Sequence, residues 1–376
     1  MAYNFDKIID SRNTRSAKWD SYPEEYLPLP VAVTDFPSSD AIVKALVTRA
    51  EHPEYGYPRP GEALLDAFLK HFEYRYGVAL EKDWINLISG IVPGLAVGSN
   101  LGEGITNVPN YGGLLNAPVR AGNALIHVPL QNVNEEYHID FDALQAALTP
   151  KTKLFYLCNP HNPIGKVYTQ EELQQISAFA KKNNLIVLSD EIHCDLVLEG
   201  KHIPFFTVDD YAREHSITFH APGKTFNIPG VTLAFAIIPN EELKKDYLKE
   251  AYALRVGGVF NITAGIAAYQ DSEDYIDAIV PYLRSNRDFV EEQLRTRFPK
   301  AKFTHTQATY LQWVDFRAYG EDLDAEFFKE HAKLVFTGGD FFGAPGYVRI
   351  NFGTNKKILG EAFDRIENAI KHRLSS

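Results

Sequence analysis

Cysteine is scarce in this sequence. The 376 residues include only Cys158 and Cys194, which cannot form a disulfide framework, and both stand in or beside apolar runs that we expect to be buried. A chain without disulfides suits a reducing compartment, so the sequence predicts a cytoplasmic location. Residues 1–7 also lack the apolar core of a signal peptide, which favours the same compartment.

Long apolar runs and basic blocks are missing as well. No stretch of about 20 apolar residues is present that could span a bilayer. The formal net charge is -11, and an acidic surface attracts neither nucleic acid nor an anionic membrane. The sequence therefore predicts no nucleic-acid partner and no membrane partner.

Metal-binding spacings are also absent. Cys158, His161, His193 and Cys194 are the ligand types that stand near one another, but they form neither a C-x2-C nor an H-x3-H pattern. We therefore predict no metal site. Gly-Lys-Thr at 223–225 resembles the end of a phosphate-binding P-loop, but that motif needs glycine where this chain has Thr218.

What the sequence does contain is an alternation of β-rich and helical segments, from about residue 85 to 240. Residues 153–158 and 185–189 read as strands, and the helix between them begins at a capping box formed by Thr169 and Glu172. Near-continuous apolar strands separated by helices indicate an α/β fold with a mostly parallel sheet covered by helices on both faces.

The character of the chain changes after residue 238. Long helical segments are expected at 241–256 and about 275–298, followed by a strand-rich stretch around 346–353 and a closing helix. We predict a large domain at residues 36–260 and a smaller α+β domain formed by residues 1–35 with 261–376. No low-complexity linker separates them, so the two domains should pack closely.

Three predicted strand ends carry a polar residue. Asn162, Asp190 and Lys224 each follow an apolar run, and ligands of such sheets bind beyond the carboxyl ends of the strands. An amide, a carboxylate and an amine delivered by three strand ends in this order are what a pyridoxal phosphate site needs. The amine can form a Schiff base, and the carboxylate can keep the pyridine nitrogen protonated so that the ring withdraws electrons.

At these motifs the chain resembles the fold-type I pyridoxal phosphate enzymes of the class I/II aminotransferase superfamily. Within it, the chain is similar to the MalY/PatB-type cystathionine β-lyases, a branch of carbon-sulfur lyases. The resemblance covers nearly the whole chain. Its markers are Asn-Thr-Arg-Ser-Ala-Lys-Trp-Asp at 13–20, Asn-Pro-His-Asn-Pro-Ile-Gly at 159–165, Ser-Asp-Glu-Ile-His at 189–193, His-Ile-Pro at 202–204 and Tyr-Val-Arg-Ile-Asn-Phe-Gly at 347–353.

The resemblance implies a role for several residues in binding the cofactor ring. Lys224 is the lysine that bonds to pyridoxal phosphate, and Asp190 is the partner of its ring nitrogen. Asn162 and His193 are expected to contact the ring hydroxyl. Tyr111, within Val-Pro-Asn-Tyr, matches the aromatic residue that stacks on the ring.

The resemblance also implies how phosphate and substrate are held. The turn Gly90-Ile91-Val92 matches the one whose backbone N–H groups hold the phosphate at a helix N-terminus. Tyr57 matches a residue that the other subunit of a homodimer contributes to the phosphate site. Arg349 matches the arginine that clamps the α-carboxylate of an amino-acid substrate, for which its planar fork is suited.

The chain departs from the pattern at a few positions. Gly223 stands where a serine commonly precedes the lysine, Ala221 provides no hydroxyl either, and Thr232 replaces a frequent arginine. Residues 30–36 read Pro-Val-Ala-Val-Thr-Asp-Phe where the lyases usually have Trp-Val-Ala-Asp-Met-Asp-Phe. The first three changes leave fewer side-chain donors for the phosphate. The change at residues 30–36 removes an aromatic ring and a carboxylate near the substrate entrance.

The function implied is that of a homodimeric carbon-sulfur β-lyase, which cleaves cystathionine or other cysteine conjugates to thiol, pyruvate and ammonia. An aminotransferase is the alternative, because both reactions use the same lysine, aspartate, asparagine and arginine. A non-catalytic protein on this fold is a third interpretation, against which the retention of Lys224 and Asp190 speaks.

Overall fold

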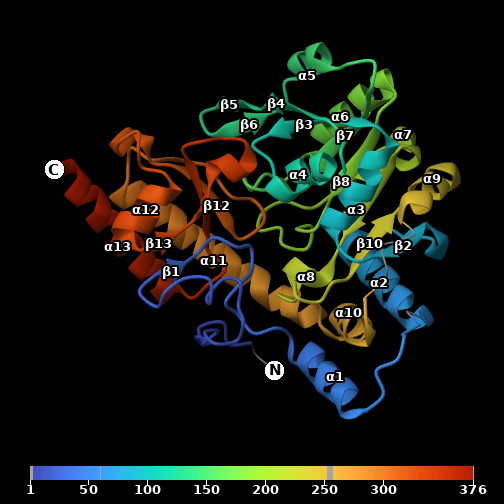
Figure 1. Ribbon diagram of the computed structural model, residues 1–376, viewed down its shortest axis with the longest axis horizontal. Helices are drawn as coiled ribbons and strands as arrows, with labels where there is room; N and C mark the ends of the chain where they lie inside the picture. Colours follow the sequence, from blue (N-terminus) through green and yellow to red (C-terminus); the bar gives the residue numbers. More distant parts are fainter. Residues whose placement is uncertain (1–2, 60, 252–256, 376) are drawn as a thin grey trace.

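A seven-stranded, mostly parallel sheet organises the described part of the chain, which in this computed structural model comprises residues 3–59, 61–251 and 257–375 (Figure 1). Neighbouring strands are parallel except at β10, which runs antiparallel to both β2 and β9. The sequence prediction of this sheet is confirmed. In spatial order its strands are β2 (Ile85–Ile88), β10 (Ala234–Ile237), β9 (Ser216–His220), β8 (Ile186–Asp190), β7 (Thr152–Cys158), β3 (Glu103–Val108) and β4 (Leu125–Pro129).

Helices cover both faces of the sheet because successive side chains of a strand point to opposite faces. On β7, Leu154 and Tyr156 belong to a buried cluster with helices of one face, while Phe155 and Leu157 belong to a cluster with helices of the other. The first face is covered by α3 (Ile91–Gly98), α4 (Gly112–Arg120) and α9 (Glu241–Ala251), and the second by α5 (Phe141–Ala147), α6 (Gln170–Asn183) and α7 (Asp210–Glu214).

The predicted capping box fixes the start of α6. Thr169 Oγ1 accepts a hydrogen bond from the backbone N–H of Glu172 at 3.2 Å, and Glu172 Oε2 accepts one from the backbone N–H of Thr169 at 2.9 Å. These contacts satisfy two backbone donors that the helix itself cannot satisfy. The helix therefore begins where the sequence predicts, and β8 follows it at the predicted place.

A second, antiparallel sheet lies in the C-terminal part, with the order β11 (Lys302–Phe303), β12 (Leu311–Asp315), β15 (Tyr347–Asn351) and β14 (Thr337–Gly338). Its helices are α11 (Glu273–Arg297), α12 (Ala325–Ala332) and α13 (Lys356–Ser375). The N-terminal segment joins this part through β1 (Leu27–Pro28), which pairs with β13 (Leu334–Val335). The hairpin of β5 (Gln131–Val133) and β6 (Glu136–His138) is separate from both sheets.

Three further helices pack together. The helix α10 (Val259–Asp271) contacts both α1 (Asp40–Glu51) and α2 (Gly61–Tyr76). The predicted domain limit at residue 260 falls inside α10, and the domain limits stay a prediction. The helix predicted at 241–256 is described as far as Ala251, and its remainder lies outside the described residues.

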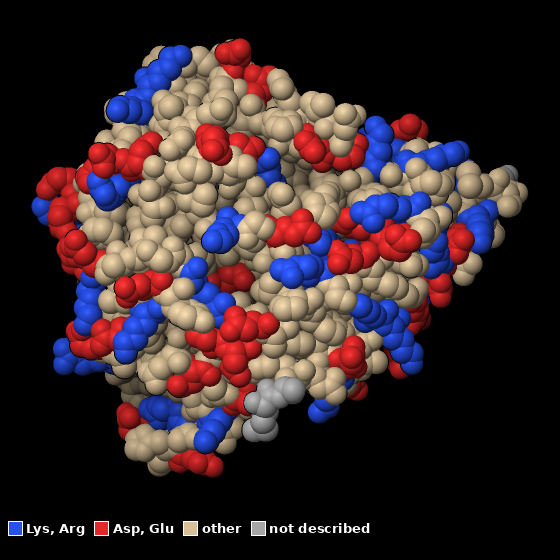
Figure 2. All heavy atoms as spheres, turned by 180° about the vertical axis from the view of Figure 1, so that it is seen from behind, with Lys and Arg blue, Asp and Glu red and all other residues tan. Residues whose placement is uncertain are grey.

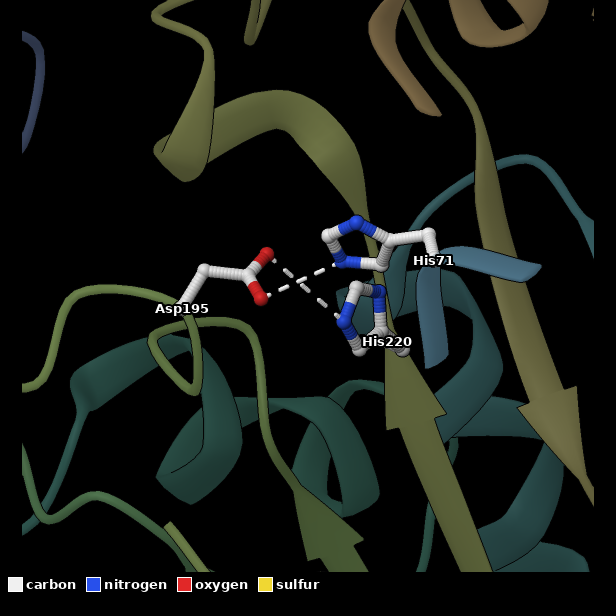
Figure 3. A group of neighbouring side chains, drawn as sticks. All are labelled: His71, Asp195 and His220. Atoms are coloured by element: carbon white, nitrogen blue, oxygen red, sulfur yellow. Dashed lines mark hydrogen bonds and ion pairs between the residues drawn. The ribbon is translucent and has the colours of Figure 1, made fainter. Parts of the chain in front are cut away.

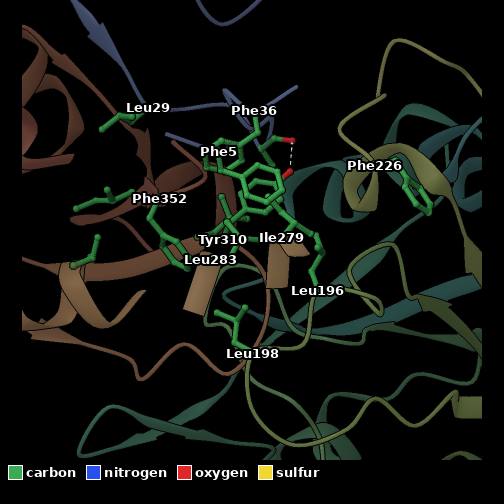
Figure 4. Packing of buried hydrophobic residues seen from close by; sticks show 14 of the residues in the cluster. Phe5, Leu29, Phe36, Leu196, Leu198, Phe226, Ile279, Leu283, Tyr310 and Phe352 are labelled. Atoms are coloured by element: carbon green, nitrogen blue, oxygen red, sulfur yellow. Dashed lines mark hydrogen bonds between the residues drawn. The ribbon is translucent and has the colours of Figure 1, made fainter. Parts of the chain in front are cut away.

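One buried apolar cluster continues from the N-terminal segment through α11 to the C-terminal sheet (Figure 4). Leu29 and Phe36 lie in it with Ile279 and Leu283 of α11 and with Phe352 after β15. The N-terminal segment is therefore fixed by packing between elements that are distant in sequence. Among the described residues, no helix combines the length and the hydropathy that a membrane crossing requires.

Candidate active site

A cavity of about 630 Å³ lies at the carboxyl ends of the parallel strands. Asn162 reaches it from the loop after β7, Asp190 from the end of β8, and Lys224 from α8 (Pro222–Thr225), the single helical turn after β9. The structure thus brings together the three residues predicted from the strand ends. The other lining residues include Tyr22, Pro30, Val31, Ala32, Ser89, Gly90, Ile91, Val92, Tyr111, His193, Thr232, Phe341 and Arg349.

Lys224 is partly buried, and its amine has no ion-pair partner among the described residues. Its Nζ donates a hydrogen bond to the backbone carbonyl oxygen of Ala32 at 2.6 Å. Burial, and with it the positive charge of Arg349, lowers the pKa of Lys224 from 10.5 to about 8, against the opposing effect of Asp190. A substantial fraction of this amine is therefore neutral near physiological pH, as a nucleophile or a base must be.

The carboxyl group of Asp190 is buried with one oxygen unused. Oδ1 accepts a hydrogen bond from the backbone N–H of Ile192 at 3.2 Å, whereas Oδ2 has no partner. Burial raises the pKa of Asp190 to about 7, against the opposing effect of that hydrogen bond. A buried carboxylate normally has a partner. Oδ2 is therefore suited to receive an N–H or cationic group of a ligand.

Arg349 extends from β15 into the opposite side of the cavity. Its Nη1 donates to Asn162 Oδ1 at 3.0 Å, and its Nη2 donates to the carbonyl oxygen of Pro30 at 2.8 Å. No carboxylate in the described ranges lies within salt-bridge distance of this guanidinium, and its buried Nε has no partner. Burial lowers the pKa of Arg349 to about 10. An oriented cation without a counter-ion is suited to bind a ligand carboxylate.

His193 and Tyr111 line the cavity between these charged groups. His193 lies in the turn after β8, and its buried Nδ1 has no hydrogen-bond partner. Burial lowers the pKa of His193, and the charges of Lys224 and Arg349 add to this effect, so the ring is neutral. The Tyr111 ring lies so close to Gly113 that a Cβ there would come within 2.4 Å of it, so residue 113 must be glycine for this ring position.

The predicted phosphate turn lies at the N-terminus of α3. Gly90 precedes the helix with φ of 156°, which side chains rarely permit, and Gly90, Ile91 and Val92 all line the cavity. Free backbone N–H groups at such a helix start attract anions. Ser89, which was not predicted from the sequence, lines the same end of the cavity.

Tyr57 is the one predicted site residue that lies away from the cavity. Its side chain is 97% exposed and does not line the cavity of this chain. Its predicted contact requires a second copy of the chain. The role of Tyr57 therefore stays a prediction.

Residues 30–36, compared above with the lyase pattern near the substrate entrance, border the cavity through Pro30, Val31 and Ala32, but the contacts that hold this segment were not predicted. Asn351 Nδ2 donates to the carbonyl oxygens of Val31 and Val33 at 2.6 and 2.8 Å, and Asn227 Nδ2 donates to that of Phe36 at 2.8 Å. These asparagines hold the Ala32 carbonyl beside Lys224. The contacts join residues about 190 to 320 positions apart, and no local sequence pattern predicts such contacts.

Tyr310 was missed as well. Its hydroxyl donates to the Ala32 carbonyl oxygen at 2.8 Å, and its ring lies 6.1 Å from that of His193. The preceding residue, Thr309, is buried with φ of 77°, a backbone conformation that is unusual for a β-branched side chain. The Ala32 carbonyl is therefore held by Tyr310 from one side and by Lys224 from the other.

Comparisons with known proteins give one family. The family described as aminotransferase class I and II matches residues 35–366. The curated cystathionine beta-lyase PatB of Bacillus subtilis (strain 168) is 32% identical, covering 98% of this chain and all of PatB. The crystal structure of OvoB superposes with a TM-score of 0.93 at 35% identity, covering 98% of this chain and 99% of OvoB. The PLP-bound C-S lyase from Staphylococcus hominis gives a TM-score of 0.92 at 30% identity, covering 98% of both chains.

Proposed function

Because the chain belongs to the aminotransferase class I and II family, we propose that it is a pyridoxal phosphate-dependent carbon-sulfur β-lyase. Its substrates would be cysteine conjugates such as cystathionine, and its products thiol, pyruvate and ammonia. The observation that carries the proposal is the cavity itself. One space holds a partly neutral lysine amine, a carboxylate with an unused oxygen and a guanidinium without a counter-ion.

The residues around the cavity fit this cofactor. The buried atoms that lack partners, Oδ2 of Asp190 and Nδ1 of His193, are those that a pyridinium N–H and a ring hydroxyl would engage. Lys224 would bond to the cofactor aldehyde, Tyr111 would stack on the ring, and Asn162 would contact the ring hydroxyl. The backbone N–H groups at residues 90–92 and the hydroxyl of Ser89 would hold the phosphate.

The bound cofactor supplies an electron sink for the bond that breaks at the substrate α-carbon. Arg349 orients the substrate by binding its carboxylate with two parallel hydrogen bonds, and Asn162 keeps the guanidinium in position. The amine of Lys224 has a pKa of about 8 and is mostly neutral above that pH, so its Nζ can accept the α-proton. The same amine can then donate a proton to the sulfur as it leaves the β-carbon.

The names of two similar proteins support a lyase over an aminotransferase. PatB, which resembles this chain over its full length, is named a cystathionine beta-lyase, and the similar Staphylococcus hominis protein is named a C-S lyase. The four residues that both reactions require are present in the cavity and do not separate the two. The products separate the two reactions, because a lyase releases pyruvate from cystathionine without an added keto acid.

The test is a pyruvate assay on the purified, cofactor-loaded protein with L-cystathionine. We expect pyruvate without a keto acid, its loss in Lys224→Ala, and its retention in Lys201→Ala, which changes an exposed lysine. Turnover that appears only when a keto acid is added would identify an aminotransferase. Cofactor absorbance without either reaction would indicate a non-catalytic protein.

We further propose that the chain forms a homodimer. Apolar side chains are exposed on α1, on the segment after it and at the start of α10, where α1 and α10 pack together. A second copy could cover this face and receive the hydroxyl of Tyr57. The residues concerned are Val43, Val47, Tyr55, Tyr57 and Phe260.

The proposed location is the cytoplasm. Both cysteines are buried and free, which fits a reducing compartment.

A further inference from the structure

Three side chains of types that bind metal ions converge from separate elements (Figure 3). His71 comes from α2, Asp195 from the turn after β8, and His220 from the last residue of β9. His71 Nε2 lies 3.2 Å from Asp195 Oδ1, and His220 Nε2 lies 3.9 Å from Asp195 Oδ2. The three ligand atoms all lie within 4.8 Å of one another, and all three residues are buried. The cluster lies outside the lining of the proposed active site.

One nitrogen of the cluster has no partner. His220 is 1% exposed, yet its Nε2 forms no hydrogen bond. A buried polar atom without a partner is destabilising by roughly 1 to 3 kcal/mol. This atom is directed at Asp195 (Figure 3), 3.9 Å from its Oδ2, so it is available to a ligand placed between the two side chains.

The outer contacts orient both histidines for a shared ligand. His71 Nδ1 lies 2.5 Å from Glu273 Oε1 and Nε2 lies 3.2 Å from Asp195 Oδ1. A carboxylate only accepts, so both nitrogens carry a proton in the absence of a cation. A cation bound at Nε2 would displace the proton of that nitrogen, while Nδ1 would keep its contact with Glu273. His220 Nδ1 is in turn 3.2 Å from the hydroxyl of Tyr269. Metal-binding histidines commonly use the second nitrogen in this way, with a carboxylate or another oxygen as its partner.

Asp195 is oriented by outer contacts as well. Thr225 Oγ1 donates to its Oδ2 at 2.8 Å, and the hydroxyl of Tyr76 donates to its Oδ1. Glu273 is itself fixed by Arg75, whose Nε donates to Oε2 at 2.5 Å. All three candidate ligands are therefore supported from outside the cluster.

We propose that His71, Asp195 and His220 bind one divalent transition-metal cation, with Zn²⁺ as the best match. Two imidazole nitrogens and one carboxylate oxygen are ligands that zinc accepts, and they leave a fourth position for water. Zinc bonds of about 2.0 to 2.2 Å place tetrahedral ligand atoms about 3.3 to 3.5 Å apart. The 3.2 Å distance, to Oδ1 of Asp195, is slightly below this separation, and the 3.9 Å distance, to Oδ2, is above it. A bound cation would therefore draw His220 and Asp195 closer together.

A second cavity lies beside the cluster. His71, Tyr269 and Glu273 line this cavity at the surface between α2 and α10, together with Lys70 and Gln270. An entry path is one of the features that a metal site must have.

The position of the site suggests what the cation does. Asp195 accepts a hydrogen bond from Thr225, which follows Lys224 in the sequence of α8. A bound cation would tie α2 and β9 to the segment that supports the lysine. The proposed role is to position α8, without contact with the substrate.

The test is metal analysis of the untagged, cofactor-loaded protein after dialysis against metal-free buffer. We expect one zinc per chain in the wild type. His71→Ala and His220→Ala should each lose at least about nine tenths of it, because two remaining ligands hold zinc poorly. His331→Ala, which removes an exposed histidine, should keep it.

A crystal of the wild-type protein gives a second measurement that does not depend on how the variants fold. An anomalous difference map at the zinc edge should show a peak between His71, Asp195 and His220. A wild type that is grown with zinc supplied, and that retains none after dialysis against metal-free buffer, would overturn the proposal. So would zinc that both variants retain, or an anomalous peak elsewhere. None of these readouts depends on catalysis, so they are separate from the test of the lyase proposal.

Discussion

At the scale of single residues, the chemistry of the candidate active site comes from charged side chains that are removed from water and have no oppositely charged partner within salt-bridge distance. Burial moves the pKa of Lys224 down to about 8 and that of Asp190 up to about 7. Both shifts bring the charged and neutral forms of these groups within reach of physiological pH. Groups perturbed in this way cluster at functional sites, and here they share one cavity with Arg349.

Asp190→Asn should slow turnover by at least ~100-fold, or about 2.7 kcal/mol of activation free energy. An amide cannot supply the negative charge that keeps a pyridinium ring protonated. Steady-state kinetics of the cofactor-loaded variant measure this effect. Asp210→Asn, at an exposed position, is the control and should be unchanged. A loss below tenfold in Asp190→Asn would remove Asp190 from the role of ring partner.

Capture of pyridoxal phosphate by the cofactor-free protein should become faster as the pH rises toward 8. Only the neutral amine of Lys224 attacks an aldehyde, and its pKa is about 8, so the neutral fraction grows about tenfold per pH unit below that value and levels off above it. Stopped-flow absorbance of the cofactor measures the rate. A rate that keeps rising to pH 10 would mean that the lysine has its ordinary pKa.

Arg349→Lys should weaken binding of an amino-acid substrate analogue by about 10- to 150-fold, equivalent to roughly 1.5 to 3 kcal/mol, with a small effect on cofactor binding. A point charge cannot reproduce a two-pronged contact with a carboxylate. Spectral titration measures both affinities. Arg317→Lys is a matched control, because Arg317 forms a two-pronged contact with Asp315 of β12 outside the cavity. Unchanged analogue binding in Arg349→Lys would make Arg349 a structural residue.

At the scale of the elements, the site depends on where strands end and helices begin. The parallel strands β7, β8 and β9 end at one edge of the sheet, and their following residues bring Asn162, Asp190 and Lys224 to one cavity. The N-terminus of α3 faces the same cavity. These positions follow from the βα alternation, which makes the carboxyl ends of parallel strands coincide.

Thr169→Ala should lower stability by about 0.5 to 2 kcal/mol without changing activity. It removes the hydroxyl that caps α6, which lies on the face of the sheet covered by α5 and α7 and contributes no residue to the cavity. The shift in the thermal denaturation midpoint measures the loss. Thr296→Ala, inside α11, is the control and should shift the midpoint less, because its hydroxyl bonds only to a carbonyl within the same helix. An equal shift in both variants would mean that the capping box contributes little.

At the scale of the whole molecule, the described surface carries scattered charge and an apolar area on α1, the segment after it and α10. Basic and acidic side chains are interspersed over the face shown in Figure 2. The exposed apolar side chains of α1, the segment after it and α10 form the area that we propose a second copy covers. Tyr57 lies there with 97% of its surface exposed.

Tyr57→Phe should weaken the affinity for pyridoxal phosphate by about 10- to 150-fold, because one hydrogen bond to a charged acceptor contributes roughly 1.5 to 3 kcal/mol. Cofactor titration measures this loss. Tyr74→Phe, which changes another exposed tyrosine, is the control. Sedimentation of the wild type should give a dimer. A fully active monomer would contradict a site completed by the partner.

Much of the fold was predictable because its signals are local. The capping box at Thr169 and Glu172 fixes a helix start within four residues of sequence, and the apolar runs that became β7 and β8 have the composition of buried parallel strands. Lys224 and Asp190 could be singled out because each directly follows such a strand. Family resemblance added Arg349 and Tyr111, for which periodicity alone gave no reason.

The sequence by itself therefore determined the sheet, the helices that cover it and the strand-end residues at the cavity. Only the tertiary structure decided that Ala32 lies against Lys224, that Arg349 pairs with Asn162, and that His71 meets Asp195 and His220. Each of these contacts joins residues more than 100 positions apart or on unrelated elements. Secondary structure depends on neighbours within a few residues, whereas such contacts depend on the packing of whole layers, which no local pattern encodes.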